Sequence, residues 1–283
     1  MAHALAAAVL RRRGTIDHVL AAYIDRPIPK RSARAMDALR LAAAQSLFLN
    51  TPDHAVVSIA VALVKEYRET AGYAGLVNAV ARKIAATGKE SIAGLPERID
   101  TPGWMWRGWE RNFGPDTARA IARAHRSEAA VDLTPKAPLP APEIAGDVHG
   151  TVLPTGSVRL PLGSKIVKLK GFAEGRWWVQ DAAAALPARL LGDVAGRIVY
   201  DLCAAPGGKT MQLAAAGAKV VAVDQEGARL KLIVENLART GLSAETVKAD
   251  ILEWSPADQA DAILLDAPCT ATGTIRRHPD ILW

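Results

Sequence analysis

Three aspartates stand at the ends of short apolar runs in the last third of the chain, and a glycine-rich turn precedes them. The aspartates are Asp224, Asp250 and Asp266, and the turn is Cys203–Lys209 within "DLCAAPGGKT". Adjacent glycines let backbone come close to a ligand, and carboxylates at neighbouring strand ends can accept hydrogen bonds from a small molecule. The pattern therefore predicts a binding site for a small polar molecule.

The turn differs from a triphosphate-binding loop at one decisive position. That loop has the pattern Gly-x-x-x-x-Gly-Lys-Thr, and Cys203 stands where its first glycine is required. A dinucleotide is disfavoured too, because Gly-x-Gly-x-x-Gly is absent from the turn. Asp224 lies at the spacing at which a carboxylate binds the two hydroxyls of a ribose. These features favour a nucleoside-bearing cofactor without a pyrophosphate, and S-adenosylmethionine fits them better than NAD.

The elements around the turn alternate between strands and helices. Short apolar runs typical of buried strands occupy residues 197–203, 219–225, 246–250 and 261–268, and helical stretches follow the first two. This alternation predicts a parallel α/β sheet with right-handed crossovers, in which ligands lie beyond the carboxyl ends of the strands. We expect a Rossmann-like domain over residues 196–283.

The rest of the chain divides into three parts. Residues 1–130 carry apolar side chains at helical spacing and many alanines, which predicts an all-helical bundle. Residues 131–150 are rich in proline and have no period, which predicts a stiff, extended linker. Residues 151–195 contain short stretches of alternating apolar and polar residues, which predict a small strand-containing connector. The fold class is thus multidomain, α followed by α/β.

Positive charge is concentrated in the helical part. Residues 1–130 hold 19 Lys and Arg against 12 Asp and Glu, whereas residues 131–283 hold 16 against 17. An excess of Lys and Arg is typical of a domain that faces a polyanion, since neutralised phosphates supply most non-specific affinity for nucleic acid. A solvated helical surface in an arginine-rich chain remains the alternative interpretation.

Other classes of protein are disfavoured by composition. The sequence has no run of 18 uncharged apolar residues and no pattern of a signal peptide, so we expect a cytoplasmic protein without a membrane partner. It contains only two cysteines and no Cys/His cluster with zinc-ligand spacing. We therefore expect reduced thiols, no bound metal and a monomeric chain.

Several stretches resemble the RNA cytosine-5 methyltransferases of the Nop/Sun family. They are "DLCAAPGGKT", "VVAVDQEGARLKLIVENLARTG" and "ILLDAPCTATGTIRRHPDILW", and "GLVNAVARK" and "TPGWMWRGWERNFG" look like a NusB-like helical domain and the segment after it. The resemblance covers essentially the whole chain. It implies a NusB-like RNA-binding domain followed by a methyltransferase domain, small-subunit ribosomal RNA as substrate and 5-methylcytosine as product.

The resemblance also implies roles for individual residues. Arg276 and Arg277 become candidates for RNA contact, and Cys269 and Asp266 become candidates for catalysis. S-adenosylmethionine would be held by Cys203, Ala204, Ala205, Pro206, Gly207, Gly208, Lys209, Asp224, Asp250 and Asp266.

The chemistry explains why thiols belong in such a site. Cytosine C5 is a poor nucleophile until a thiolate adds at C6, and loss of the C5 proton later expels the thiolate, which is covalent catalysis by an activated cysteine. In the family the nucleophile lies in a Thr-Cys-Ser motif, and a second cysteine, which Cys269 matches, assists product release. Asp266 could bond the N3 edge of cytosine as charge develops there.

This sequence departs from the family pattern at the nucleophile. It contains no Thr-Cys-Ser, and we expect a chain truncated before that motif, with catalysis belonging to the full-length protein. The alternative is a module that binds RNA and cofactor without catalysing transfer. A further alternative is another Rossmann-like enzyme with a different nucleotide cofactor.

Overall fold

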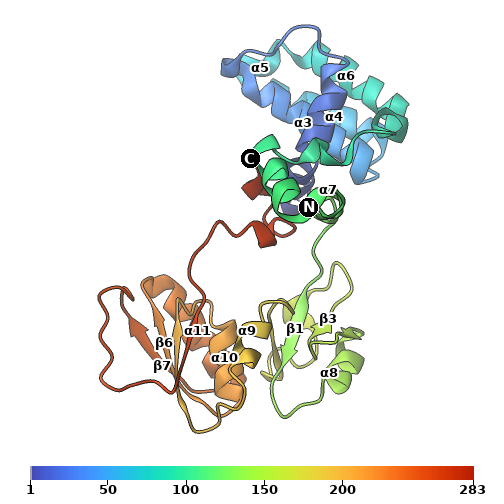
Figure 1. The fold of residues 1–283 in the computed structure, drawn as a ribbon. Coiled ribbons are helices and arrows are strands. Elements are labelled where there is room, and N and C mark those ends of the chain that lie inside the picture. The colour runs from blue at the N-terminus through green and yellow to red at the C-terminus, as the bar shows by residue number, and fades with distance from the viewer. Residues whose placement is uncertain (1) are drawn as a thin grey trace. The chain divides into compact units, whose positions relative to one another are not determined.

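The computed structural model describes residues 2–283, which form two compact units (Figure 1). The first, called the helical unit, consists of residues 2–129 together with Ala271–Trp283. The second, called the sheet unit, is Ala130–Thr270. The chain therefore leaves the helical unit once, builds the sheet unit and then returns.

The helical unit is built from seven helices and confirms the predicted helical N-terminal part. They are α1 (Ala2–Arg11), α2 (Arg13–Ala21), α3 (Ala33–Phe48), α4 (Asp53–Lys65), α5 (Arg68–Ala71), α6 (Ala74–Thr87) and α7 (Gly103–His125), with 3-10 turns η1 (Lys30–Ser32), η2 (Gly88–Ile92) and η3 (Glu97–Asp100). Its core is rich in buried alanines such as Ala43 and Ala60. Small side chains let α3, α4 and α6 pack closely.

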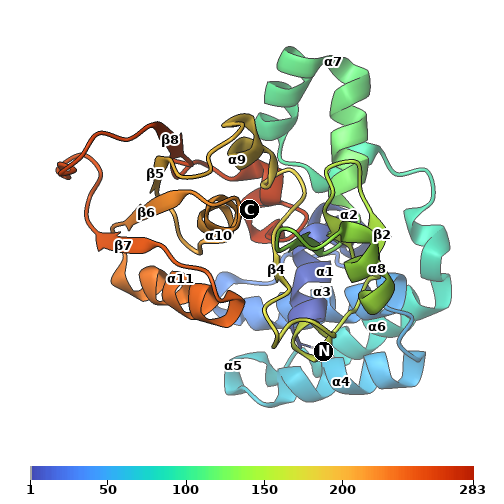
Figure 2. The same cartoon turned by 90° about the horizontal axis from the view of Figure 1, so that it is seen from below.

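Helix α7 is broken in its middle. Gly114 has φ 80° and ψ 166°, which are not helical angles, and Pro115 follows it. Proline has no N–H to donate and clashes with the preceding turn, so a helix that meets it kinks or starts again. Figure 2 shows the two resulting rods.

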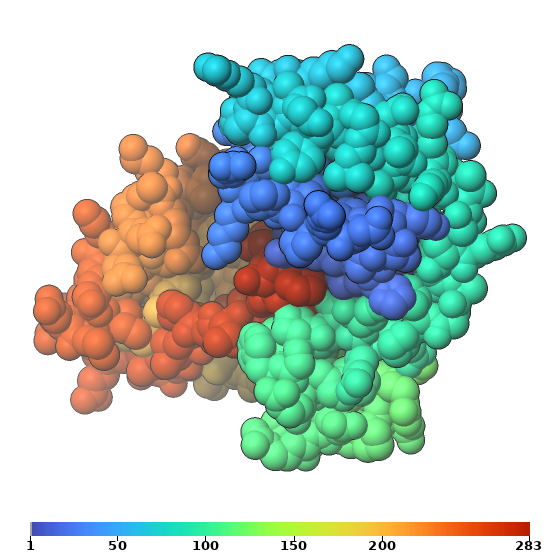
Figure 3. Space-filling model, turned by 90° about the horizontal axis from the view of Figure 1, so that it is seen from above, coloured from blue at the N-terminus to red at the C-terminus, as the bar shows by residue number. Residues whose placement is uncertain are grey.

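The C-terminal segment Ala271–Trp283 packs in the helical unit, and this corrects the predicted domain boundary. We expected residues 196–283 to form one domain, but Ile275 and Leu282 are buried with Met105 of α7. The indole Nε1 of Trp283 donates a hydrogen bond to the carbonyl of Leu10 at 2.8 Å. Figure 3 shows this segment, in red, against the blue N-terminal residues and the green residues of α7. Buried apolar contacts and not sequence order decide where the segment belongs.

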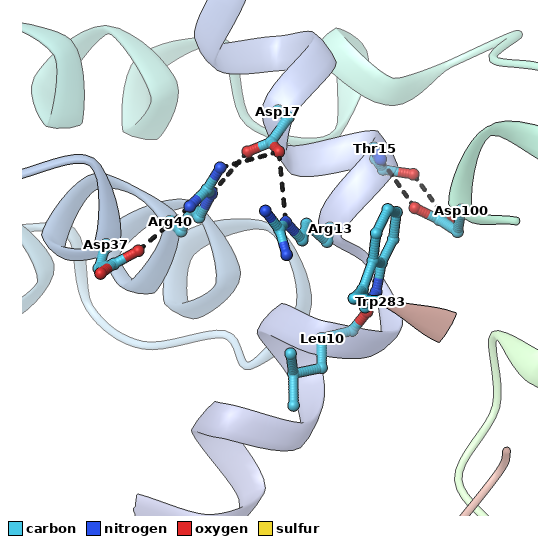
Figure 4. A network of polar contacts seen from close by, with 8 residues as sticks. All are labelled: Leu10, Arg13, Thr15, Asp17, Asp37, Arg40, Asp100 and Trp283. Carbon is cyan, nitrogen blue, oxygen red and sulfur yellow. Dashed lines mark hydrogen bonds and ion pairs between the residues drawn. The ribbon is translucent and has the colours of Figure 1, made fainter. Parts of the chain in front are cut away.

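A close contact joins α2 to η3 (Figure 4). The carboxylate of Asp100, which is 4% exposed, accepts hydrogen bonds from the backbone N–H of Thr15 at 2.7 Å and from its hydroxyl at 2.9 Å. Gly14 lies at the same contact, and a Cβ added there would come within 1.8 Å of the Ile99 carbonyl oxygen. The absence of a side chain at this glycine is therefore what lets α2 approach η3.

The sheet unit begins with a four-stranded antiparallel sheet in the order β2-β3-β1-β4. Its elements are β1 (Asp132–Pro135), α8 (Ala141–Val148), β2 (Thr151–Val152), β3 (Val158–Arg159), η4 (Ile166–Lys168) and β4 (Trp177–Val179). The prediction of an extended linker over residues 131–150 is wrong, because β1 and α8 lie there. Proline misled the prediction, since Pro142 in the first turn of α8 needs no N–H partner.

The second sheet of this unit is parallel, as predicted, in the order β7-β6-β5-β8. Its elements are α9 (Leu186–Leu190), β5 (Ile198–Leu202), α10 (Gly208–Ala215), β6 (Lys219–Asp224), α11 (Gly227–Thr240), β7 (Glu245–Lys248) and β8 (Ala262–Leu265). Val199, Val220 and Leu264 are buried together with residues of α9 and α10. Leu202 pairs with both Val223 and Leu265, so the carboxyl ends of β5, β6 and β8 lie at one edge.

Two adjacent tryptophans in β4 join the two sheets. Trp177 is buried in the core of the antiparallel sheet and α8, whereas Trp178 is buried with residues of α10 and α11. Alternate residues of a strand face opposite sides, so a single strand serves both cores. Arg239 of α11 adds hydrogen bonds to the carbonyls of Phe172 and Trp177, at 2.8 and 3.1 Å. The antiparallel sheet is thus a fixed part of the unit.

Over residues 2–283, no helix combines the length and the apolar character that crossing a lipid bilayer would require.

The α2–η3 contact predicts opposite effects for two glycine substitutions. Gly14→Ala should lower the free energy of unfolding by about 1–3 kcal/mol, because the new methyl group forces α2 away from η3. Gly108→Ala is the matched control, since this helical glycine has open space around its Cβ position, and it should raise stability by about 0.5–1 kcal/mol. Urea unfolding of both variants measures the difference, and equal effects would contradict the proposed contact.

Candidate functional site

The predicted turn lies between β5 and α10. Cys203 adopts φ 61° and Gly207 φ 96°, both in the left-handed region, and Gly208 begins α10. A side chain at Gly207 would also meet Ile233 of α11 at 3.2 Å. Glycine is needed at this position because it tolerates positive φ and leaves room for the close approach of α11.

The turn is held in place by Asp224, the last residue of β6. Asp224 is 3% exposed, and its two oxygens accept hydrogen bonds from the backbone N–H of Ala205 at 3.1 Å and of Glu226 at 3.0 Å. Arg229 of α11 donates to the carbonyl of Ala205 at 2.6 Å, and its guanidinium lies 3.9 Å from the Asp224 carboxylate. These contacts connect the turn, the end of β6 and the beginning of α11.

A second buried carboxylate lies beneath the turn. Asp201 of β5 is fully buried, and its Oδ2 accepts a hydrogen bond from the hydroxyl of Thr210 at 2.6 Å, whereas its Oδ1 has no hydrogen-bond partner. Burial raises the pKa of Asp201 to about 6, although the Thr210 hydrogen bond and Lys209 oppose this shift. An ionised carboxylate without water is costly, so this group takes up a proton more readily than an exposed one.

A cavity of about 280 Å³ opens beside the turn at the carboxyl edge of the sheet. It brings together three of the predicted residues, Cys203, Asp224 and Asp250. The Oδ1 atom of Asp250 accepts the backbone N–H of Leu252 at 3.0 Å. The other lining residues are Gln225, Arg229, Ala249, Ile251, Leu252 and Pro268. The cavity thus combines carboxylates, a guanidinium and apolar side chains.

Other predicted residues lie outside the lining of this cavity. Ala204 and Ala205 are buried in the core beneath the turn, and Pro206 is exposed. Asp266, which follows β8, has a side chain that is 62% exposed, and it accepts a hydrogen bond from Lys209 Nζ at 2.6 Å. This ion pair joins the start of α10 to the segment after β8.

The two cysteines have different surroundings, and neither is in a disulfide. Cys203 is half-buried, and burial together with the Asp224 carboxylate raises the pKa of its thiol. A raised pKa means less thiolate, which is the reactive form. Cys269 is exposed.

The two arginines expected to contact RNA belong to the helical unit. Arg276 and Arg277 lie in the C-terminal segment and not in the sheet unit. Among residues 2–283, no group of three or more His, Cys, Asp or Glu side chains is arranged to hold a metal ion.

Sequence reasoning missed Asp201, Thr210 and Arg229. Asp201 precedes the glycine-rich turn by only a few residues, so its position at a strand end was a usable signal. Arg229 lies in the first turn of the helix after Asp224, where a cation can approach that carboxylate. The contact of Arg229 with the Ala205 carbonyl depends on tertiary structure and has no signature in the sequence.

A parallel sheet with a glycine-containing turn after β5, and carboxylates around the adjacent cavity, defines a Rossmann-like α/β part that follows a helical part in the chain. Residues 188–283 match the family of 16S rRNA methyltransferases RsmB/F, and residues 1–86 match the NusB family. The chain belongs to the 16S rRNA methyltransferase RsmB/F family.

Individual relatives cover nearly the whole chain. The ribosomal RNA small subunit methyltransferase B of Vibrio cholerae is 34% identical over a gapped alignment of 298 positions that covers 97% of this chain and 67% of that protein. The protein of the same name from Pseudomonas putida is 34% identical over a gapped alignment of 301 positions, with coverages of 98% and 67%. The chain therefore spans about two thirds of the length of these relatives.

A solved structure shares the fold. The crystal structure of PH0851 superimposes with a TM-score of 0.73 at 21% sequence identity, covering 99% of this chain and 68% of that one.

The buried Asp201 predicts a pH-dependent stability. Its folded-state pKa of about 6 lies above the ordinary value of 3.8, so its stabilising contribution is complete below pH 3.8 and is lost as pH rises through 6. Lowering the pH from 7.5 to 5 should therefore stabilise the chain by roughly 1 kcal/mol relative to Asp201→Asn. Urea unfolding at both pH values measures this difference. Asp193→Asn, at an exposed residue of the same unit, is the control, and an equal response of all three proteins would contradict the prediction.

Proposed function

We propose that this chain binds S-adenosylmethionine in the cavity beside Cys203 and Asp224 and takes part in the methylation of cytosine C5 in small-subunit ribosomal RNA. The observation that carries the proposal is the cavity itself, which lies at the carboxyl edge of a parallel sheet and is lined by two strand-end aspartates. Ligands of such sheets bind at this edge. The names of the relatives, which are ribosomal RNA small subunit methyltransferases, support the choice of substrate.

The residues around the cavity fit a nucleoside-bearing cofactor. Each Asp224 oxygen accepts one backbone N–H, and a carboxylate has about four acceptor positions, so capacity remains for the two hydroxyls of a ribose. Asp250 could accept from the amino edge of adenine. The backbone of Cys203–Gly207 would lie against the rest of the molecule, since Cys203 belongs to the cavity wall. When bound, S-adenosylmethionine supplies an electrophilic methyl group on its sulfonium.

The RNA side of the proposal rests on Asp266 and Cys269. The exposed side chain of Asp266, positioned by Lys209, would in its protonated form donate a hydrogen bond to N3 of the target cytosine as charge develops there. The exposed thiol of Cys269 would assist product release. The target base must leave any helix to reach these groups. Arg276 and Arg277 would contact the RNA backbone.

The nucleophilic role is not assigned to Cys203. The raised pKa of its thiol disfavours the thiolate, and its position in the cavity wall supports a role in cofactor binding instead. Neither of the two cysteines of these 283 residues lies in a Thr-Cys-Ser sequence. We therefore assign to this chain cofactor binding and RNA recognition, with Cys269 in an assisting role.

Removing the charge of Asp224 should weaken cofactor binding. A hydrogen bond to a charged group contributes about 1.5–3 kcal/mol, so Asp224→Asn should reduce the affinity for S-adenosylmethionine by about tenfold to a hundredfold in calorimetry. The matched control is Asp258→Asn, which removes a charge from an exposed residue of the same unit and should leave affinity unchanged. Equal affinities of the two variants, both shown to be folded by circular dichroism, would refute the ribose assignment.

The assignment of roles predicts binding without transfer. The 283-residue chain, incubated with labelled S-adenosylmethionine and unmodified small-subunit ribosomal RNA, should bind the cofactor but place no label in 5-methylcytidine on nucleoside analysis. Label in 5-methylcytidine would show that Cys269 or Cys203 acts as the nucleophile, and Cys269→Ser would identify which. Tight binding of NAD or ATP in place of S-adenosylmethionine would contradict the proposed cofactor.

A further inference from the structure

Four arginines gather in the helical unit where α1, the end of α7 and the C-terminal segment meet. Arg11 ends α1, Arg12 follows it, Arg126 follows α7, and Arg276 lies in the C-terminal segment. All four are half-buried. We call this group the arginine cluster. Every member belongs to the same compact unit.

Two members of the cluster are fixed by backbone carbonyls. A terminal nitrogen of Arg11 donates to the carbonyl of Arg276 at 3.0 Å, and a terminal nitrogen of Arg276 donates to the carbonyl of Glu128 at 2.6 Å. The Nε atoms of both arginines are buried and have no hydrogen-bond partner. Each guanidinium is therefore held in place by a terminal nitrogen with its Nε atom turned into the protein, while part of each side chain remains exposed to solvent.

The other two members share a single carboxylate. The Nε atoms of Arg12 and Arg126 each lie 3.4 Å from Oδ2 of Asp100. Asp100 also accepts two hydrogen bonds from Thr15, so most of the acceptor positions of its carboxylate are already occupied by groups of the helical unit (Figure 4).

Positive charge exceeds negative charge around the cluster. The cluster holds four guanidiniums, whereas the carboxylates beside it are Asp100, which contacts Arg12 and Arg126, and Glu128, which acts on Arg11. The pKa of Arg11 is lowered, chiefly by burial and also by Arg276, with Glu128 opposing. Burial and Arg276 lower the pKa of the neighbouring His125, which favours its neutral form. Partly buried charges are normally paired, and here four guanidiniums outnumber the two carboxylates beside them.

We propose that Arg11 and Arg276 together bind one phosphate group of the RNA backbone. The proposal rests on the function proposed above, which makes RNA the substrate. Planar guanidiniums with N–H groups in a fixed fork match phosphate oxygens and carry no base specificity. Arg12 and Arg126 supply the surrounding positive potential.

The connectivity of the chain explains why RNA is favoured over free phosphate. Arg276 follows Cys269 by seven residues, and seven residues span about 25 Å at most. A backbone phosphate held by Arg276 would therefore lie within a few nucleotides of the target base. A free phosphate ion would gain nothing from this proximity.

The test is the salt dependence of RNA binding by the full 283-residue chain. The probe is a fluorescein-labelled 20-nucleotide single-stranded RNA, titrated between 50 and 250 mM KCl with wild type, Arg11→Met, Arg276→Met and the double variant. The control is Arg31→Met, which removes an exposed arginine from the same unit. A phosphate contact to a single strand contributes about 0.7 to the slope of log affinity against log salt.

Arg11→Met and Arg276→Met should each weaken binding by about fivefold to tenfold at 50 mM KCl and lower the slope by about 0.7. The double variant should lose little more than either single variant, because both side chains hold one phosphate. Arg31→Met should change neither quantity comparably. If Arg11→Met matches Arg31→Met in affinity and slope, the cluster serves only to fasten the C-terminal segment and the proposal fails.

Two further measurements separate the causes of a negative result. Arg11→Lys keeps a positive charge that can still contact the C-terminal segment. If Arg11→Met disturbs folding, its melting temperature should fall, whereas that of Arg11→Lys should not. Saturation by inorganic phosphate at equal ionic strength, without RNA binding, would identify free phosphate as the ligand and overturn the proposal. If the wild-type chain binds S-adenosylmethionine but not RNA, the proposed RNA substrate is contradicted as well. If the wild-type chain binds RNA and the variants bind it equally well, only the proposed role of the arginine cluster is contradicted.

Discussion

The buried carboxylate of Asp224 is the contact on which the arrangement of the site depends. A carboxylate that is 3% exposed needs hydrogen-bond partners, and these come from the backbone of Ala205 and Glu226. One residue at the end of β6 thereby fixes both the turn that follows β5 and the start of α11. The backbone that borders the cavity is held by the last residue of a sheet strand.

Long periodic segments of this fold could be predicted from the sequence, and short ones could not. The helices of the N-terminal part and the parallel strands β5, β6 and β8 have strong apolar patterns. Strand β1 carries Asp132 and Thr134 as buried residues, which is unlike an apolar strand. Asp132 is satisfied by Arg159, and Thr134 by Gln180. Such partners lie far along the chain, so no local pattern reveals the strand.

The candidate site also has features that could be predicted from the sequence and features that could not. Strand ends and glycines are marked by residue type, so Cys203, Asp224 and Asp250 could be selected from sequence alone. The environment of a side chain is a property of the folded chain. Burial decides that the Asp201 carboxyl binds a proton easily and that the Cys203 thiol resists losing one. The packing of Ile275 and Leu282 on Met105 likewise has no sequence signature, because an apolar residue does not specify which core it will enter.

The return of the chain to the helical unit makes the sheet unit an insertion. The helical unit is completed by Ala271–Trp283, which are synthesised only after the whole of Ala130–Thr270. During translation, the apolar surface of α7 that Ile275 and Leu282 later cover therefore stays exposed to solvent while the sheet unit is synthesised. The entropic cost of closing so long a loop grows only slowly with its length, and a folded insertion brings its own two ends to fixed positions. The helical unit can thus finish folding only after the sheet unit, which is inserted in its sequence, has been synthesised.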